Sequence, residues 1–472
     1  MLTLADLFEA LSGDSPPQAR RRPITDAVID SRRAIPGSLF IAIPGSRTDG
    51  HEYVADAFQR GASYALVERD VSGLPVVDLR KPDWMQEGKE FSPPYCLRVE
   101  NTVRALQQTA RFWRERMKHI KVVGITGSVG KSTTKEVTAG VLSERYRTLK
   151  NEGNFNNEIG LPLTLLRLSE GHQRAVLEMG FYVPGEIAFL CEIAKPHIGV
   201  VTNIGTVHAE RAGSQEAIFE GKSELVQSLP ADGIAILNQD DPWVRRMAER
   251  TQAHVFTYGL TPEADLWADH IEGLGLEGVR FRLHYKHDTL YLRVPMIGRH
   301  SVHTALRAAA VGLAEGLSWE EIVRGLRGGH AQLRLVAVRS ASGALLLDDT
   351  YNASPASTLA ALNLLEELEG HKIAVLGDML ELGPYERQGH EMVGVRAAQA
   401  ADELITVGPR AHIIASAARS AGMPRRRIAE VEDTEEAIAL LRDRLTENDV
   451  VLVKGSRSMH METIVSALEA AE

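Results

Sequence analysis

The stretch Lys121-Val-Val-Gly-Ile-Thr-Gly-Ser-Val-Gly-Lys-Ser-Thr133 decides the fold of this chain. It begins with an apolar run of the length of a buried strand, continues through a glycine-rich turn and ends on Lys-Ser-Thr. A strand, a glycine-rich turn and a helix that opens with Lys-Ser together point backbone N–H groups and a helix dipole at phosphate groups. The stretch therefore predicts a nucleotide-binding loop at the edge of an open α/β sheet.

This loop departs from the strict phosphate-loop pattern, because Ile125 stands where the first glycine belongs. A glycine-rich turn followed by a fortuitous Lys-Ser is the alternative interpretation. We predict that Lys131 reaches the β- and γ-phosphates as a catalytic cation and that the hydroxyl of Ser132 holds Mg²⁺. The predicted ATP-binding residues of the loop are Gly127, Ser128, Val129, Gly130, Lys131, Ser132 and Thr133.

Composition restricts the class of protein. A chain of 472 residues is longer than one hydrophobic core usually supports, so several domains are expected. Its content of 44% hydrophobic and 25% charged residues is typical of globular domains. The net charge of -10 argues against a general nucleic-acid binder. Two cysteines, Cys96 and Cys191, do not suggest a disulfide scaffold. Neither a signal peptide nor an apolar run of membrane-spanning length is apparent, so we expect a soluble cytoplasmic protein.

Apolar strand-like runs alternate with helical patterns along the chain and predict an α/β fold in three domains. A small N-terminal α/β domain is expected at 1–98, a central P-loop-type ATPase with a parallel sheet and helices at 99–332, and a third α/β alternation at 333–472. The central runs end near Glu178, Thr202 and Leu237.

Polar side chains follow several of these strands, at the sheet edge where ligands of open α/β folds bind. Glu178 is a candidate magnesium ligand, with a solvated edge residue as the alternative. His208 lies at the same edge, with a capping residue as the alternative. Asn238 is a candidate ATP-binding residue, since its amide could contact a nucleotide's ribose or base, with an ordinary turn as the alternative. Lys222 lies in a helical pattern, where a lone lysine is normally a solvated charge. In the third domain Asp349, Asn352 and Lys454 follow strands, and two such edges facing each other would form a cleft.

Eight segments in order along the chain closely resemble the Mur ligase family. They are Thr126–Glu136, Gly153-Asn-Phe-Asn-Asn-Glu-Ile-Gly160, Glu178-Met-Gly180, Thr202-Asn-Ile-Gly205, Asn238-Gln-Asp-Asp241, Asp349-Thr-Tyr-Asn-Ala-Ser-Pro355, Gly377-Asp-Met-Leu-Glu-Leu-Gly383 and Lys454-Gly-Ser-Arg457.

The resemblance implies an N-terminal domain that holds a UDP-sugar, a central ATPase and a Rossmann-like C-terminal domain that closes over the site. ATP would phosphorylate the terminal carboxylate of a UDP-muramoyl-tripeptide, and the amine of D-Ala-D-Ala would attack the acyl phosphate. We expect these small-molecule substrates, ATP and Mg²⁺, with no nucleic acid and no membrane span, and a chain that acts as a monomer.

The resemblance also implies roles for individual residues. Ser132 and Glu178 would hold one magnesium ion. Lys222 matches the family's carbamylated lysine, whose added carboxylate would help to bind a second one, with His208 close by as a catalytic residue. Further residues implied by the resemblance are Arg334, Asp349 and Asn352 for ATP, and Ser31, Arg32 and Gly45 for the UDP-sugar.

One segment departs from the family pattern. Two asparagines associated with adenine contacts are replaced by Ser301 and Thr304, and a hydroxyl reproduces only part of an amide's hydrogen bonding. The D-N-P-R motif of a neighbouring member is absent, and Asp349–Pro355 favours the dipeptide-adding activity. The alternatives are the third-residue-adding activity, a folylpolyglutamate synthase, or a P-loop NTPase module that is not a ligase.

Overall fold

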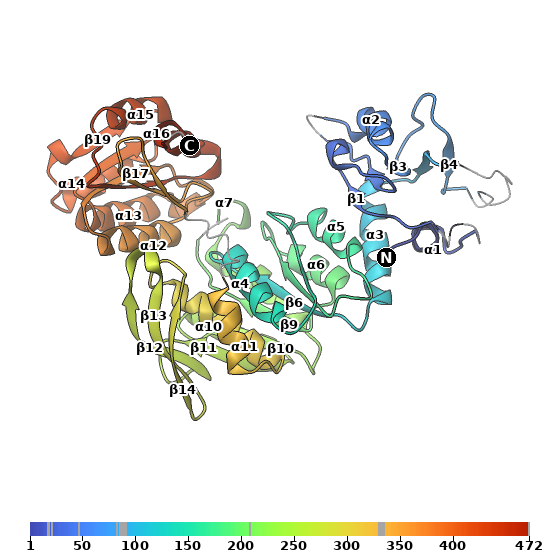
Figure 1. Cartoon of the computed structure of the whole chain (residues 1–472), viewed down its shortest axis with the longest axis horizontal. Coiled ribbons are helices and arrows are strands. Elements are labelled where there is room, and N and C mark those ends of the chain that lie inside the picture. The colour runs from blue at the N-terminus through green and yellow to red at the C-terminus, as the bar shows by residue number, and fades with distance from the viewer. Residues whose placement is uncertain are drawn as a thin grey trace.

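The computed structural model describes the chain except for residues 17, 18, 20, 21, 46, 47, 82, 83, 85–91, 207, 208, 329–335, 471 and 472. Three α/β units, each built on its own sheet, follow one another along the chain. In Figure 1 the N-terminal and C-terminal units lie above the central one, on opposite sides of it. The predicted three-domain α/β class is confirmed, whereas the boundaries at 98 and 332 stay predictions.

The N-terminal unit contains a parallel sheet of five short strands in the order β1-β2-β3-β5-β4. Helices α1 (Leu4–Ser12) and α2 (Val54–Gln59) belong to this unit. The strands are β1 (Ala27–Val28), β2 (Leu39–Ile41), β3 (Tyr64–Val67), β4 (Val76–Asp78) and β5 (Tyr95–Arg98).

Helix α3 (Thr102–Arg116) joins this unit to the next. The side chain of Asn101 accepts a hydrogen bond from the backbone N–H of Arg104 and so caps the helix start. Leu106 and Trp113 on the helix are buried in one apolar cluster with residues of α1 and of α5 (Gly160–Leu166). Burial of this shared layer fixes the N-terminal unit against the central one.

The central unit is a sheet of nine strands in the order β14-β13-β12-β11-β10-β9-β6-β8-β7. Successive residues of β6 (Lys121–Thr126) point to opposite faces, so that Val122 packs with α5 and α6 while Val123 packs with α4 and α10. The strands are β6, β7 (Thr148–Lys150), β8 (Arg174–Glu178), β9 (Ile198–Val201), β10 (Ile234–Asn238), β11 (His254–Gly259), β12 (Leu266–Gly273), β13 (Val279–Tyr285) and β14 (Asp288–Val294). The remaining helices are α4 (Lys131–Ser143), α6 (Glu186–Ala194), α7 (Ala209–Ala212), α8 (Gln215–Gln227), α9 (Pro242–Arg246), α10 (Ser301–Ala314) and α11 (Trp319–Arg327).

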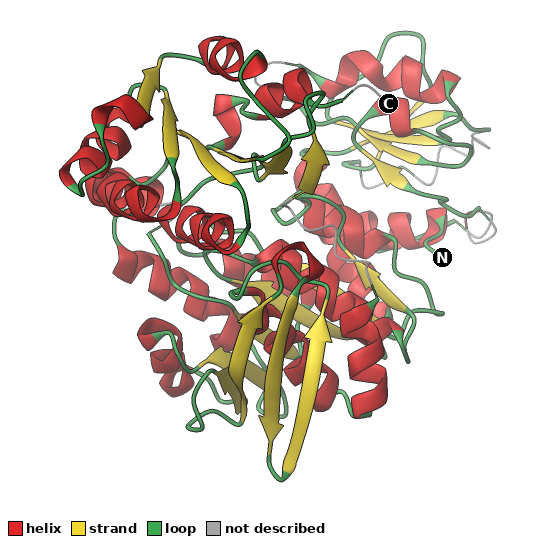
Figure 2. Ribbon diagram, turned by 60° about the vertical axis from the view of Figure 1, so that its left-hand side comes forward, coloured by secondary structure: helices red, strands yellow, loops and turns green. Residues whose placement is uncertain are grey.

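The far edge of the central sheet differs from the expected parallel arrangement. Strand β13 pairs antiparallel with both β12 and β14, whereas β6 to β12 pair in parallel. Buried and more exposed residues alternate along β13, as they do where one face of an antiparallel sheet meets water. The long antiparallel strands are prominent in Figure 2.

The C-terminal unit has six strands in the order β15-β16-β20-β17-β18-β19, with only β15 antiparallel. Apolar clusters lie on both faces of this sheet, as in a doubly wound fold. The strands are β15 (Val336–Arg339), β16 (Leu345–Asp348), β17 (His371–Gly377), β18 (Glu403–Val407), β19 (Ile428–Val431) and β20 (Asp449–Lys454). The helices are α12 (Pro355–Glu367), α13 (Glu386–Ala400), α14 (His412–Ser420), α15 (Thr434–Arg442) and α16 (Glu462–Leu468). Across the described part of the chain, no helix combines the length and the apolar character that crossing a membrane requires.

Candidate active site between the central and C-terminal domains

The glycine-rich loop connects β6 to α4 through two glycines with positive φ. Gly130 has φ +83° and is the N-cap of α4, and Gly127 has φ +141°. A Cβ atom on Gly127 would overlap the hydroxyl of Thr202. Glycine is therefore required at this position both for its backbone conformation and for the close approach of β9.

The segment after β9 holds this loop in place. The backbone N–H groups of Ser128 and Val129 donate to the carbonyl and the side-chain oxygen of Asn203, both over 2.9 Å. In return the Thr202 hydroxyl donates to the Val129 carbonyl over 2.7 Å, and the Gly205 N–H donates to the Ser128 hydroxyl over 2.8 Å. Asn203 was not predicted as a site residue, although its position directly after a buried strand is the signal that would have indicated it.

Lys131 begins α4 and bends back over the loop. Its Nζ atom donates to the carbonyl oxygens of Gly127 over 2.8 Å and Ser128 over 3.3 Å. The ammonium group thus lies at the helix N-terminus, where the helix dipole and the loop amides already favour an anion.

Ser132, in the first turn of α4, meets Glu178 at the end of β8. The Ser132 hydroxyl donates to Glu178 Oε2 over 2.7 Å, and Asn156 Nδ2 donates to the other carboxylate oxygen over 2.9 Å. Asn151 bonds both the backbone N–H and the carbonyl of Glu178. A hydroxyl and a carboxylate in contact are oxygen ligands of the type that Mg²⁺ takes beside substrate phosphates, so the pair fits the predicted metal.

Lys222 lies on α8 and is fully buried. Its Nζ atom donates to the Gly127 carbonyl over 3.1 Å and lies 4.6 Å from the centre of the Phe181 ring. Burial, and next the nearby charge of Lys131, lowers the pKa of Lys222 well below its ordinary value of 10.5. The structure therefore favours a neutral amine here, in contact with the phosphate loop, rather than a solvated charge.

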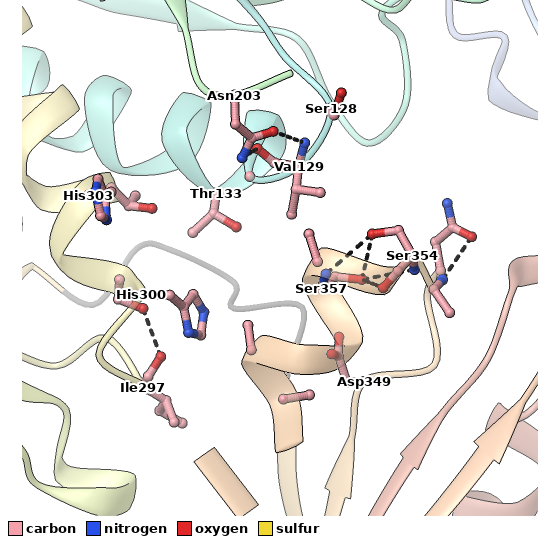
Figure 3. Close-up of a pocket in the computed structure, with 18 of the residues that line it drawn as sticks. Ser128, Val129, Thr133, Asn203, Ile297, His300, His303, Asp349, Ser354 and Ser357 are labelled. Carbon is pink, nitrogen blue, oxygen red and sulfur yellow. Dashed lines mark hydrogen bonds between the residues drawn. The ribbon is translucent and has the colours of Figure 1, made fainter. Parts of the chain in front are cut away.

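A cavity of about 360 Å³ opens between the loop and the C-terminal domain. Figure 3 shows Ser128, Val129 and Thr133 on one side and Ser354, Ser357 and Asp349 on the other. Two facing sheet edges therefore form the expected cleft. The cavity brings together the predicted residues Ser128, Val129, Gly130, Thr133, Asn238, Asp349, Asn352 and Lys454, and adds Asn203, His300, His303, Arg307, Ser354 and Ser357.

On the C-terminal side Lys454 is almost fully buried and is held at the end of β20. Its Nζ atom lies 2.6 Å from Asp349 Oδ2 and donates to the Asn352 carbonyl over 2.9 Å. Ser354 caps α12 by accepting a hydrogen bond from the Ser357 N–H. These contacts fix the polar wall that faces the phosphate loop.

Asn238 lines the same cavity, but both ends of its amide have protein partners. Its Nδ2 donates to the Thr202 carbonyl over 3.0 Å, and its Oδ1 accepts from the Asp240 N–H over 3.1 Å. The first bond ties the end of β10 to the residue after β9, and the second closes the turn after β10. Both are structural contributions beside the predicted ligand role.

The N-terminal turn of α10 forms a third wall, to which Ser301 and Thr304 belong. His303 bonds Asp240 through Nε2 over 2.7 Å. His300 is exposed at the cavity, yet desolvation in the cleft, with Arg307, lowers its pKa to about 4. Desolvation and the positive neighbours both lower the pKa of His300, so its imidazole is neutral at neutral pH.

Several predicted residues lie elsewhere. His208 and Arg334 fall outside the described residues. In the N-terminal domain Ser31 is buried, Arg32 pairs with Asp30 over 2.7 Å, and the Gly45 N–H donates to the Thr48 carbonyl.

A second cavity, of about 240 Å³, lies between the N-terminal sheet and α5, and its lining includes the chain neighbours of Ser31 and Arg32. Asp30, Arg33, Phe155 and Arg167 are among its lining residues, and Ser31, Arg32 and Gly45 are not.

A phosphate loop on a parallel sheet, with a hydroxyl–carboxylate pair beside it and a second α/β domain across the cleft, defines a nucleotide-binding enzyme of the α/β class. Models of three Mur ligase parts match the chain: the Mur ligase family catalytic domain over residues 23–114, the middle domain over 125–312 and the glutamate ligase domain over 333–457.

Individual proteins match over their whole length. UDP-N-acetylmuramoyl-tripeptide–D-alanyl-D-alanine ligase from Bacillus subtilis is 34% identical over 99% of this chain and 98% of its own. The crystal structure of MurF from Acinetobacter baumannii has a TM-score of 0.83 and 31% identity, covering 99% of this chain and 98% of that one. MurF ligase from Thermotoga maritima in complex with ADP has a TM-score of 0.75 and 28% identity, covering 94% and 96%. The chain belongs to the Mur ligase family.

Proposed function

We propose that this chain is an ATP-dependent, ADP-forming ligase that joins D-Ala-D-Ala to UDP-N-acetylmuramoyl-tripeptide. The observation that carries the proposal is the end-to-end similarity to ligases with this printed activity. The cavity supports it, because the phosphate loop and the C-terminal strand ends face each other across a space of about 360 Å³. The reaction supplies a peptidoglycan precursor in the cytoplasm, and we propose that the chain acts as a monomer.

The chemistry requires two steps. A carboxylate oxygen of the tripeptide attacks the γ-phosphorus of ATP, the bond to the β-phosphate oxygen breaks, and ADP leaves. The amine of D-Ala-D-Ala then attacks the acyl carbon, a proton is lost from nitrogen, and the tetrahedral intermediate expels phosphate to leave the amide. Both steps bring anionic groups together, so the protein must neutralise charge and hold the reactants in line.

Residues of the central domain fit these requirements. The loop amides and Lys131 surround the position where a phosphate chain binds a helix N-terminus. Ser132 and Glu178 would hold Mg²⁺, which neutralises the developing charge on the transferred phosphoryl group. Thr133 lines the cavity one residue further along α4, and Asp349 and Asn352 face it from the C-terminal domain.

Lys222 fits the proposed carbamate. A neutral amine can attack CO₂ through its lone pair and release a proton, and a lowered pKa supplies the neutral form. The product is a carboxylate attached to the lysine, which would add an oxygen ligand for a second magnesium ion close to Gly127. His208 and Arg334 lie outside the described residues. By family resemblance we propose that His208 is catalytic and that Arg334 contacts ATP.

We propose that the N-terminal domain binds the UDP-sugar. Ser31, Arg32 and Gly45 are proposed contacts by resemblance, and the neighbouring cavity contains the basic residues Arg33 and Arg167. Both guanidinium groups could pair with phosphate oxygens.

The test is phosphate release by the purified chain with ATP, Mg²⁺ and UDP-N-acetylmuramoyl-tripeptide, with one amine acceptor at a time. We expect release to depend on D-Ala-D-Ala, and mass spectrometry should identify the pentapeptide product. Diaminopimelate or lysine with the UDP-muramoyl-dipeptide is the matched comparison. Release that requires one of these acceptors instead, or that needs no UDP-sugar, would overturn the proposal.

A further inference from the structure

Arg307 is a buried cation in the wall of the interdomain cavity. It lies on α10 beside the run Ala308-Ala-Ala310, and only 4% of the residue is exposed. Holding a guanidinium away from water is costly unless an anion or several hydrogen-bond acceptors compensate for the lost hydration.

Among the described residues, Arg307 has no anionic partner and few hydrogen-bond acceptors. Its Nη2 donates to the Thr304 hydroxyl over 2.8 Å, and its Nη1 lies 3.5 Å from the Tyr258 hydroxyl. Its Nε–H is buried and has no hydrogen-bond partner. Burial raises the pKa of Tyr258 to about 12, so the phenol is neutral and is not a counter-ion. No carboxylate in the described part of the chain forms an ion pair with this guanidinium.

The guanidinium lies beside the phosphate loop. A Cβ atom built on Gly130 would be 3.3 Å from Arg307 Nη2, and that atom is the nearest one to it. Gly130 is the N-cap of α4 and lines the same cavity as Arg307 and Thr133. The free donors of Arg307 are therefore close to the loop amides that begin α4.

We propose that Arg307 binds the phosphate chain of the nucleotide. This inference rests on the proposed function, since it requires ATP to occupy the cavity. A planar guanidinium forms paired hydrogen bonds to phosphate oxygens, and a phosphate would supply both the counter-charge and the acceptors that the buried side chain lacks.

Thr304 has a defined part in this arrangement. Its hydroxyl accepts from Arg307 Nη2 and so orients the guanidinium toward the loop. At position 304, where the family pattern has an asparagine amide, this chain therefore has a hydroxyl that positions a cation. Helix α10 therefore contributes a positive charge to the cavity wall beside the phosphate loop.

The test compares ligands that differ only in phosphate. ADP and adenosine are titrated against the full chain and its Arg307→Met variant, with binding measured by competition against a fluorescent ADP analogue. We expect ADP affinity to fall about 10- to 100-fold, the size of a lost charge-assisted hydrogen bond. Adenosine affinity should change by less than about twofold, because adenosine has no phosphate for Arg307 to bind.

Thermal unfolding separates binding from a structural role. Methionine fills similar volume and removes an unpaired buried charge, so the unfolding temperature of Arg307→Met should be equal to or above that of the wild type. Arg324→Met removes the same charge from an exposed site on α11 and should leave ADP affinity unchanged. Arg307→Lys, which retains a buried cation without the planar fork, should lose ADP affinity by a smaller factor with adenosine unchanged.

Unchanged ADP affinity in Arg307→Met would overturn the assignment, as would equal losses for ADP and adenosine in either variant. A wild-type chain that binds no ADP would instead contradict the proposed function itself, so the two failures are distinguishable.

Discussion

The Nζ atom of Lys222 lies 3.1 Å from the carbonyl oxygen of Gly127, which joins the middle of α8 to the first residue of the phosphate loop. A solvated lysine would not be placed there, because the side chain is fully buried and burial lowers its pKa. The contact connects two features that the sequence shows separately: a shortened phosphate loop and an isolated helical lysine.

Lys222→Ala should lose ligase activity by roughly 100-fold or more, because a carbamate ligand near the phosphates can no longer form. Added formate or acetate should restore part of the activity, since a free carboxylate can enter the space left by the side chain. Lys222→Arg places a permanent cation at this position and cannot form the carbamate, so it should show neither activity nor rescue. Activity is measured as phosphate release, after circular dichroism has established that each variant is folded. Wild-type activity in Lys222→Arg would contradict the carbamate.

Glu178→Gln and Ser132→Ala should raise the Mg²⁺ concentration needed for half-maximal activity, because each removes or weakens an oxygen ligand. Asn156→Ala should have the same effect to a smaller degree, by roughly 10-fold, since Asn156 only orients the Glu178 carboxylate over 2.9 Å. The measurement is ligase rate against Mg²⁺ at saturating substrates. An unchanged Mg²⁺ requirement in Glu178→Gln would show that this carboxylate is not a ligand of the metal.

Gly127→Ala should destabilise the central domain, by roughly 1–3 kcal/mol from the backbone conformation alone and by more from the overlap with Thr202. Gly205→Ala is the matched control on the facing segment. A Cβ atom there would lie 3.5 Å from Ser128 Cβ, an ordinary contact, so its unfolding free energy should change little. Urea unfolding of both variants measures the difference, and equal stabilities would show that the loop relaxes around the new methyl group.

The strand order of the central unit explains which parts of the site could be predicted. The loop at Gly127, the carboxylate at Glu178 and the strand end at Asn238 each follow an apolar run, and the carboxyl ends of parallel strands share one edge. Asn203 also follows a buried strand, and that position would have indicated it. The burial of Arg307 beside the phosphate loop depends on contacts between segments far apart in the chain, which no local pattern encodes. The antiparallel strands β13 and β14 were not predicted, because their apolar residues alternate with polar ones and form no long continuous apolar run.

His390 provides a pH-dependent contribution to stability in the C-terminal domain. It is fully buried on α13, its Nδ1 bonds the Glu386 carbonyl over 2.7 Å, and its Nε2 accepts from the Met379 N–H over 3.1 Å. This pair of bonds requires the neutral ring, protonated on Nδ1 alone. Burial is the main cause that lowers the pKa of His390 below its ordinary value of 6.5.

Between the lowered pKa and 6.5 the unfolded chain binds more protons at this position than the folded chain does, so protonation favours unfolding. The contribution is complete above 6.5 and is lost as the pH falls through the folded pKa. Urea unfolding at about pH 7 and about pH 5 should therefore show a loss of stability in the wild type that is smaller in His390→Gln, which cannot titrate. His412→Gln is the control, because that histidine is exposed beside Glu430 and its replacement leaves the buried bonds intact. The same pH dependence in His390→Gln and the wild type would show that other groups cause the loss.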